Sequence, residues 1–353
     1  MAVALMDEPV EALLLRVSPD NPACLVRAAL VCKDWCRIIS DPGFLRRYRE
    51  FHGTPPMLGF LRNHGTISSF VPTSSFCPPR ALNRNFPAID ARHGRILLHS
   101  VPWELGDNPL DNPFVVLNPI TGERRELPLL PWSFNPYSWN AAVLCASTGA
   151  CDHLDCHYGP FLVVFVGTDI EGMFAYVYTS EANTWGERAS TQYPSGEIIL
   201  APSVLVGNAF YFMFWYSESI LKYDLGTQEM IVIQVPPECS FRRVVLMTTD
   251  DGELGFAYME NYRLYLWSME AGPDGDGNVE WAQSRVIELE TLLPDHALSD
   301  SLDVAGFADG VAVIFVRTDD GIFTIDLKSY RVTKVCSDGW YYGNVPYMSF
   351  CTP

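Results

Sequence analysis

The sequence lacks the features that would place the protein outside the cell or in a membrane. Its 353 residues contain no Asn-x-Ser/Thr acceptor, and no apolar run approaches the length of a membrane-spanning helix. The first residues carry no basic segment ahead of an apolar stretch, so we expect no signal peptide. The ten cysteines are too sparse for a dense disulfide framework. These absences predict no membrane partner and a reducing compartment, the cytosol or the nucleus.

The sequence also lacks the linear motifs of common enzyme classes. It has no G-x-S-x-G elbow, phosphate-binding glycine loop, dinucleotide fingerprint or H-E-x-x-H motif. We therefore expect no catalytic residue and no cofactor. A catalytic site gathered from separate parts of a β domain stays open as an alternative, because no linear motif would reveal it.

Basic side chains are scarce and unevenly placed. The chain has 24 Lys and Arg against 42 Asp and Glu, a net charge of −18. Residues 1–52 hold seven acids and seven bases, so all of that charge lies in residues 53–353. Such a domain repels phosphate backbones, which argues against nucleic acid as a partner. The charge favours a basic protein or peptide through steering, and solubility alone also accounts for it.

Residues 1–52 have the pattern of short apolar helices. Pro22 and Pro42 each follow a capping residue, Asp20 or Asn21 in the first case and Asp41 in the second. Apolar positions recur at a helical spacing of three and four: Leu25, Ala28, Ala29, Cys32, Trp35, Cys36 and Ile39. So short a segment is marginal alone, and burying each Leu- or Val-sized side chain gains roughly 1.5–3 kcal/mol. The apolar stripe therefore packs on the rest of the chain or on another protein.

Residues 5–48 resemble an F-box. The specific part is Val31-Cys32-Lys33-x-Trp35 followed by Ser40-Asp41-Pro42-x-Phe44. The chain departs from the family at Met6, where Pro is usual, and at Pro9, where Leu is usual. Because Pro is tolerated only in the first turn of a helix, we expect the first helix to begin at Pro9 or just before it.

The resemblance implies that the helices bind the Skp adaptor of a cullin-based ubiquitin ligase. The apolar contact, or the layer directly beneath it, would comprise Leu5, Val10, Leu13, Leu14, Val17, Leu25, Val31, Cys32, Lys33 and Trp35. The rest of the chain looks like the F-box proteins expanded in plants, in which a C-terminal β domain selects a target protein. Two alternatives stay open: a β-domain enzyme capped by the helices, and a scaffold whose Met6 and Pro9 weaken adaptor binding.

The remaining residues divide into a junction and a repetitive β domain. Residues 53–90 are rich in Pro, Ser and Asn, with one strand expected at residues 57–61. Residues 91–353 show five imperfect units spaced by roughly 45–60 residues, each with an apolar strand followed by a second and a third. We expect a small all-α F-box (1–52), a junction (53–90) and an all-β, kelch-like propeller (91–353) of about six blades. Residues 57–61 and 346–350 would pair to close the ring, and an irregular β-sandwich is the alternative.

Two loops invite a functional interpretation. Trp132, Phe134, Tyr137 and Trp139 lie among prolines between two units and are candidates for target contact, although rings there also serve to fill gaps between blades. Cys145-x5-Cys151-x-His153-x2-Cys156 resembles a zinc ligand set. Its spacing is not the paired C-x2-C form, so we predict no metal and an exposed loop with reduced cysteines.

Overall fold

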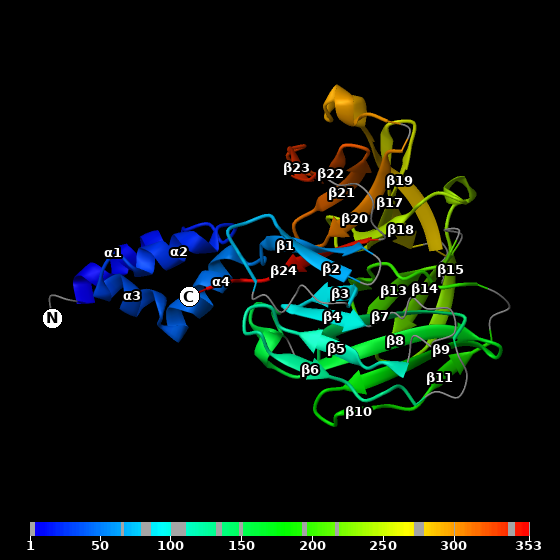
Figure 1. Ribbon diagram of the computed structural model, residues 1–353, viewed down its shortest axis with the longest axis horizontal. Coiled ribbons are helices and arrows are strands. Elements are labelled where there is room, and N and C mark those ends of the chain that lie inside the picture. Colours follow the sequence, from blue (N-terminus) through cyan, green and yellow to red (C-terminus); the bar gives the residue numbers. More distant parts are fainter. Residues whose placement is uncertain are drawn as a thin grey trace.

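The computed structural model describes residues 4–64, 67–78, 86–99, 111–131, 136–147, 151–192, 196–215, 219–271, 279–299, 301–337 and 343–352. It has a helical part that stands off one side of a ring of β-sheets (Figure 1). None of the described helices has the length and apolarity to cross a membrane.

The helical part contains α1 (Ala4–Leu14), α2 (Pro22–Ala29), α3 (Lys33–Ile39) and α4 (Pro42–His52). The cap predicted at Asp41 is confirmed, because its carboxylate accepts the Phe44 N–H at 2.8 Å. Asn21 occupies the N-cap position of α2 with Pro22 after it, but its side chain makes no capping bond.

The predicted start of the first helix was wrong. Helix α1 begins at Ala4, so Pro9 lies inside it, and the bond from position 9 to the Leu5 carbonyl is lost because Pro has no N–H. The apolar stripe over residues 25–39 is divided between two helices. The N–H groups of Leu30 and Val31 bond the carbonyls three residues back, at 3.1 Å each, and this tight turn separates α2 from α3.

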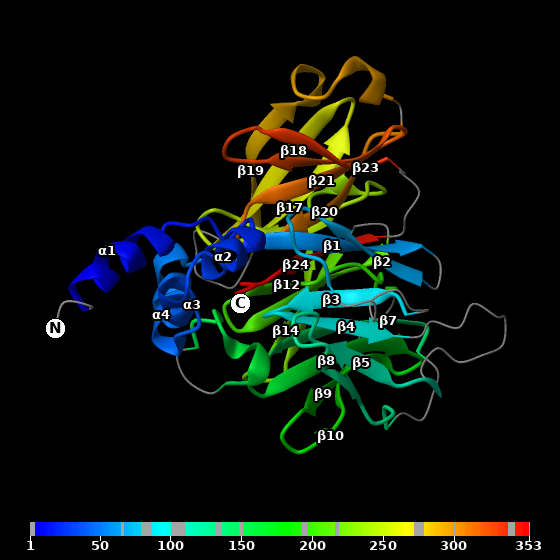
Figure 2. The ribbon, with the colours of Figure 1, turned by 60° about the vertical axis from the view of Figure 1, so that its left-hand side comes forward.

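The helices share a small core with the C-terminal segment. The buried members of this helical core are Leu14, Leu25, Ile38, Ile39, Phe44, Tyr48 and Phe350. Phe350 follows the last strand of the ring and lies with its ring edge-on to Tyr48, at a centroid distance of 6.3 Å. The helical part is therefore anchored by a residue more than 300 positions further along the chain than Tyr48, as the red C-terminal trace beside the blue helices shows (Figure 2).

Six antiparallel sheets form the ring, and we call them blades 1 to 6. In the order of hydrogen-bonded neighbours, blade 1 contains β24 (Gly343–Met348), β1 (Met57–His64) and β2 (Ile67–Pro72). Blade 2 contains β3 (Ala88–Arg92), β4 (Arg95–His99), β5 (Phe114–Leu117) and β6 (Arg124–Glu126). Blade 3 contains β7 (Ser138–Cys145), β8 (Phe161–Asp169), β9 (Gly172–Thr179) and β10 (Thr184–Trp185), and β11 (Ala189–Thr191) also pairs with β9. Blade 4 contains β12 (Val204–Val206), β13 (Ala209–Met213), β14 (Ser219–Asp224) and β15 (Met230–Gln234). Blade 5 contains β16 (Val245–Thr248), β17 (Leu254–Glu260), β18 (Arg263–Ala271) and β19 (Val279–Glu288). Blade 6 contains β20 (Asp303–Ala308), β21 (Val313–Thr318), β22 (Gly321–Asp326) and β23 (Val332–Cys336).

The ring closes as the sequence predicts. Strand β1 pairs with β24, with Phe60 opposite Pro346 and Leu61 opposite Val345. The prediction of a propeller with about six blades is confirmed, and the β-sandwich alternative is wrong. Strands β1 and β2 lie within the stretch predicted as a junction, and β3 starts at Ala88, just before the predicted start of the repeats.

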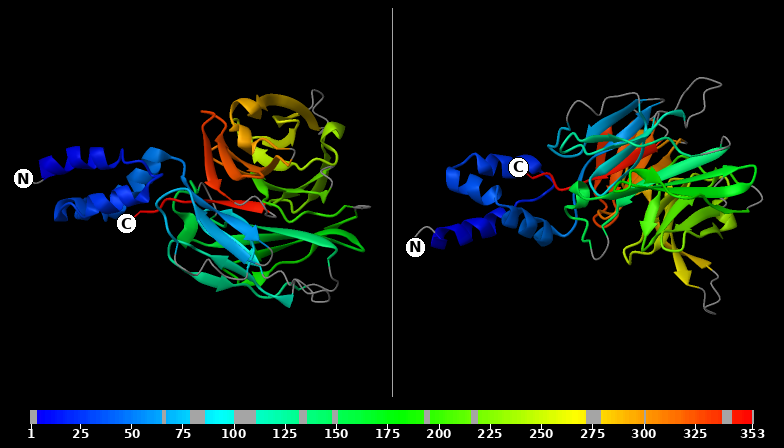
Figure 3. Two further views of the ribbon diagram at one scale, coloured as in Figure 1. Left: turned by 45° about the horizontal axis from the view of Figure 1, so that its top comes forward. Right: turned by 90° about the horizontal axis from the view of Figure 1, so that it is seen from below.

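The first strand of each blade lies at the centre, where β24 contacts β3 and β20, β3 contacts β7, and β16 contacts β12 and β20. Because successive strands alternate in direction, the loops after first and third strands open on one face, which we call the helix-side face. It carries Phe350 and residues 146–160, both of which reach the helices. The loops after second and fourth strands form the opposite, distal face. Figure 3 shows the helices on one side of the ring only.

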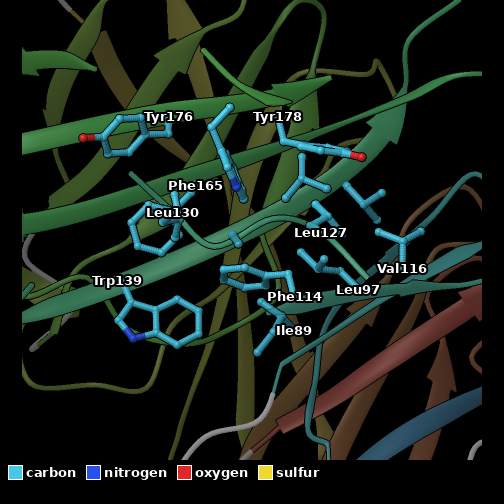
Figure 4. Close-up of a cluster of buried hydrophobic side chains, with 14 of the residues drawn as sticks. Ile89, Leu97, Phe114, Val116, Leu127, Leu130, Trp139, Phe165, Tyr176 and Tyr178 are labelled. Carbon is cyan, nitrogen blue, oxygen red and sulfur yellow. The ribbon is translucent and has the colours of Figure 1, made fainter. Parts of the chain in front are cut away.

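Apolar side chains fill the space between blades. Between blades 2 and 3, Leu97 and Phe114 meet Phe165 and Tyr178 in one buried cluster (Figure 4). Phe114 and Phe165 make an edge-to-face contact with centroids 6.0 Å apart. These contacts make the blades a continuous body rather than separable sheets.

His99 lies fully buried beside this cluster, and its ring centroid is 4.3 Å from that of Phe114. Its Nε2 lies 3.1 Å from the Asn112 carbonyl oxygen, while Nδ1 has no partner among the described residues. Burial lowers the pKa of His99 to about 4, against the opposing effect of the bond to Asn112.

The buried His99 predicts acid sensitivity. Since its pKa is lower in the folded state, its contribution to stability is complete above its ordinary pKa and is lost as the pH falls toward 4. We expect this residue to remove about 2 kcal/mol from the free energy of unfolding between pH 7 and pH 5. His99→Phe should flatten the pH dependence of stability measured by urea unfolding. An unchanged slope in His99→Phe would contradict the assignment.

Candidate functional site

The helical part exposes a group of large apolar side chains. Among the described residues these are Leu13, Val26, Leu30, Val31 and Phe51, which we call the exposed helical surface. Leu30 is 80% exposed, Val31 65% and Leu13 63%. Isolated exposed apolar residues are ordinary, but residues 1–52 hold five of the sixteen large apolar side chains that are exposed in the described part of the 353-residue chain.

The residues predicted to contact an adaptor fall into two layers. Leu13, Val31, Cys32 and Lys33 are exposed, whereas Leu14 and Leu25 are buried in the helical core and Val10, Val17 and Trp35 pack against that core half-buried. Leu5 lies in α1, and its side chain is outside the described residues. The ring does not cover Val31, Cys32 or Cys36, which flank Trp35 in the chain, so this apolar side of the helices stays open.

Polar contacts add to the anchorage of the helical part. Asp155, in the loop between β7 and β8, forms an ion pair with Arg49 of α4, and Leu154 packs against the helical core. Ser75, after β2, accepts the Ala23 N–H at 3.0 Å. Contacts from two separate loops therefore hold the helices in one orientation on the ring.

The distal face carries the largest share of exposed apolar residues of the ring. The described ones are Ile67, Leu129, Tyr137, Ile170, Leu200, Trp215 and Phe241, and we call them the distal apolar residues. Tyr137 and Ile170 are 65% and 68% exposed. The Tyr137 N–H donates to the Thr168 carbonyl at 2.7 Å, which places Tyr137 beside the end of β8, just before the turn that carries Ile170. Large apolar and aromatic side chains of this kind anchor protein interfaces.

The four aromatic residues predicted as target contacts lie in different surroundings. Tyr137 is on the distal face, and its role in target contact stays a prediction. Trp132 and Phe134 lie outside the described residues. For Trp139 the prediction was wrong, because its indole is buried and stacks on Phe165 at a centroid distance of 5.7 Å, as the close-up shows (Figure 4). It fills the gap between blades.

A pocket of about 260 Å³ opens at the centre of the helix-side face, lined in part by Asp90, Arg92, His93, His153 and Asp309. Clustered acids and histidines are what a propeller enzyme would need. Here Arg92 lies 3.6 Å from Asp90 and 3.9 Å from Asp309, and Asp90 accepts the Val143 N–H at 2.9 Å. The acids are committed to structural bonds, and the volume is at or below the lower limit of small-molecule sites.

The electrostatics of this pocket also follow from structure. Burial raises the pKa of Asp90, and the neighbouring Arg92 acts against that rise. Burial, together with the neighbouring charges of Arg92, His153 and Arg95, lowers the pKa of His93 to about 2, so His93 is neutral. Its Nδ1 accepts the Cys145 N–H at 3.0 Å. Asp90, Asp309 and His93 are thus each engaged in a structural hydrogen bond.

A second, larger hollow of about 860 Å³ lies between blades 5 and 6 on the helix-side face. Its acidic lining is Asp250, Asp251, Glu253 and Glu270, and Arg285 lies 3.9 Å from Asp250. Part of the negative charge of the ring is therefore concentrated in this hollow, which would attract a positively charged segment of another protein.

The cysteine–histidine cluster differs from the prediction of an open, exposed loop. Cys145 and Cys156 are buried, and the potential ligand atoms of Cys145, Cys151, His153 and Cys156 all lie within 4.8 Å of one another. The sequence offered these four residues as a possible ligand set, but their spacing does not show that they converge, because that depends on where β7 ends and how the following loop folds back.

Comparison with known proteins gives one family and several distant structures. The family model described as F-box protein AT5G49610-like, beta-propeller, matches residues 88–353. No curated protein matches the chain. Similar solved structures include a nidogen/laminin complex (9% identity, TM-score 0.45, covering 83% of this chain and 99% of that chain). Others are a functionally unknown protein from Desulfotomaculum acetoxidans DSM 771 (9%, 0.45, 82% and 99%) and YjhT (12%, 0.39, 72% and 84%). No functional conclusion follows from these structures.

Proposed function

The chain belongs to the F-box protein AT5G49610-like β-propeller family, and from this premise we propose that it is the substrate-recognition subunit of a Skp–cullin–F-box ubiquitin ligase. The helical part would bind the Skp adaptor and, through it, the cullin. The ring would hold a target protein, and the chain would contribute proximity rather than chemistry.

The observation that carries this proposal is the exposed helical surface. Leu13, Leu30 and Val31 stay more than 60% exposed although the ring and the C-terminal segment pack against the other side of the same helices. Burying side chains of this size gains roughly 1.5–3 kcal/mol each, so a partner that covers them would bind tightly. The alternative of a helical cap on an enzyme does not explain why this side is left open.

The position of the helices also supports an adaptor role. They are fixed to the helix-side face by the Arg49–Asp155 ion pair and by Phe350, which leaves the distal face open to another protein. A rigid link of this kind would hold a target at a constant distance from the bound adaptor. That geometry is what proximity catalysis requires.

We place target contact on the distal apolar residues. Double replacement of Tyr137 and Ile170 by Ala should weaken target capture by about tenfold or more, because such anchors each contribute over about 1 kcal/mol. Adaptor binding should not change. The measurement is recovery of candidate targets on immobilised protein, and the matched control is Tyr330→Ala on the other face. Loss of capture in Glu253→Lys instead would move the target to the acidic hollow.

The proposed function is tested by affinity purification from cells treated with a cullin inhibitor. We expect the Skp adaptor and a cullin to co-purify, and at least one further protein to accumulate on the bait only when ubiquitin transfer is blocked. Absence of the adaptor, with the purified chain still folded, would leave the scaffold alternative in which Met6 and Pro9 weaken the helical contact.

A further inference from the structure

We propose that Cys145, Cys151, His153 and Cys156 bind one structural zinc ion that fixes the helical part to the ring. All four potential ligand atoms lie within 4.8 Å of one another. Three thiolates and one imidazole are a frequent ligand set of structural zinc, and four protein ligands leave no position for a substrate.

Two separations between ligand atoms match the edges of a tetrahedral site. The Sγ atoms of Cys145 and Cys151 are 3.9 Å apart, and Cys156 Sγ lies 3.6 Å from His153 Nδ1. Zinc–sulfur bonds of about 2.3 Å and a zinc–nitrogen bond of about 2.0–2.1 Å require edges of about 3.8 Å and about 3.6 Å in a regular tetrahedron. A disulfide would need the sulfur atoms at about 2.05 Å, so the arrangement is not that of a bonded cysteine pair.

The surroundings of the four ligands hold them in place. The His153 ring stacks on His93 with centroids 3.9 Å apart and planes 7° from parallel. His93 in turn accepts the Cys145 N–H, and the Ser147 N–H points at Cys145 Sγ at 3.4 Å. Hydrogen bonds to ligand sulfur and fixed ligand rings are the usual outer contacts of metal sites.

A buried positive charge beside the cluster supplies an independent argument. Arg95 is 3% exposed and donates to the carbonyl oxygens of Cys156 and Gly159 at 2.9 and 2.5 Å. Within the described part of the chain, no carboxylate lies within ion-pair distance of it, and its Nη1 has no partner. A buried guanidinium needs a counter-charge. Three thiolates, a neutral imidazole and Zn²⁺ carry a net charge of −1, which provides it.

The ligands flank the residues through which this loop contacts the helices. Leu154 and Asp155 lie between the ligands His153 and Cys156, and they are the residues that contact the helical core and Arg49 of α4. A zinc ion at this point would stiffen the short segment through which the ring holds the helices. Its loss would loosen the helices without opening the blades.

The test measures zinc in the purified full-length protein by inductively coupled plasma mass spectrometry. We expect about one zinc per chain, and less than about a tenth of that in Cys151→Ser and in His153→Ala, whose side chains are the less buried ligands. Cys77→Ser, at an exposed cysteine elsewhere, is the matched control and should keep the metal. Replacement of zinc by Co²⁺ should give the visible absorption of a tetrahedral thiolate site.

A second measurement separates a structural role from simple binding. Removal of zinc by a chelator should speed amide hydrogen exchange in α4 and residues 151–158 by at least about tenfold, with blade 5 unchanged. The proposal is overturned if folded protein made in zinc-containing medium carries none, if both ligand variants keep the metal, or if mass spectrometry finds a Cys145–Cys151 disulfide in its place. Unchanged exchange after zinc removal would overturn the role in holding the helices.

Discussion

The double variant Leu13→Asp, Val31→Asp is expected to lose adaptor binding by at least about a hundredfold while the ring stays folded. Both side chains are more than 60% exposed, so the substitutions remove apolar surface from the proposed contact and add two charges that binding would have to desolvate. Loss of roughly 1.5–3 kcal/mol for each side chain corresponds to a combined loss of about two to four orders of magnitude. Titration with purified Skp adaptor measures it.

The control for this experiment carries the same chemical change elsewhere. Ile231→Asp, Val286→Asp introduces two carboxylates at exposed apolar positions on outer strands of blades 4 and 5, and should leave adaptor affinity within about twofold. Full binding by the Leu13, Val31 variant would contradict the assignment of the exposed helical surface. Trp35→Ala is a weaker test, because Trp35 packs against the helical core and its loss also destabilises the helices.

Phe60→Ala is expected to destabilise the ring by about 3–5 kcal/mol, the cost of emptying a fully buried aromatic site. Phe60 lies on β1, and its ring is 5.0 Å from that of Phe315 in blade 6. It therefore packs blade 1, the sheet in which β1 and β24 close the ring, against blade 6. Urea unfolding followed by tryptophan fluorescence should show the lower midpoint.

A control variant and a hydrogen-exchange measurement show which part of the ring loses stability in Phe60→Ala. Tyr330→Ala, at an exposed aromatic position of blade 6, should change stability by less than about 0.5 kcal/mol. Hydrogen exchange in Phe60→Ala should increase first in β1, β2 and β24, because these strands form the blade that carries Phe60. Equal stability of Phe60→Ala and the unmodified chain would show that closure does not depend on this contact.

The sequence predicted the outer strands of the blades far better than the inner ones. The five predicted units correspond to the second, third and fourth strands of blades 2 to 6, which are apolar runs separated by polar turns. The first strands escaped notice. Strand β12 has three residues, and β3 contains Asp90 and Arg92, whose side chains pair with each other at the centre of the ring. Polar residues in a central channel break the apolar pattern on which strand prediction depends.

Strand β7 was missed for a different reason. Its sequence from Ser138 is apolar, but Trp139 follows a stretch of prolines and aromatic residues and was assigned with them to a loop. Its register with β8 places Cys145 opposite Phe161, at the start of the loop that carries the other three cluster residues. Neither the buried Trp139 nor the meeting of Cys145 with Cys151, His153 and Cys156 follows from spacing, since both depend on strand pairing.

The helices were predicted in outline, because their caps and prolines are local signals. Asp41 and Pro42 gave the start of α4 correctly. The predicted start of α1 was wrong. Proline inside a helix costs one hydrogen bond, and α1 forms around Pro9 in spite of that cost. The open side of the helices could be recognised only by resemblance, since a periodic apolar stripe does not say which chain covers it.

The place of Phe350 has a consequence for how the protein is made. A ribosome produces α1 to α4 first, but the residue that completes their core emerges only after all six blades, directly behind the strand that shuts the ring. A chain that ends before β24 would lack the strand that pairs with β1 to close the ring. It would also lack Phe350, which completes the core of the helices. Closure of the ring and anchorage of the helices are thus completed together, so an incomplete chain should lack the fixed orientation of the helices on the ring that the full chain has.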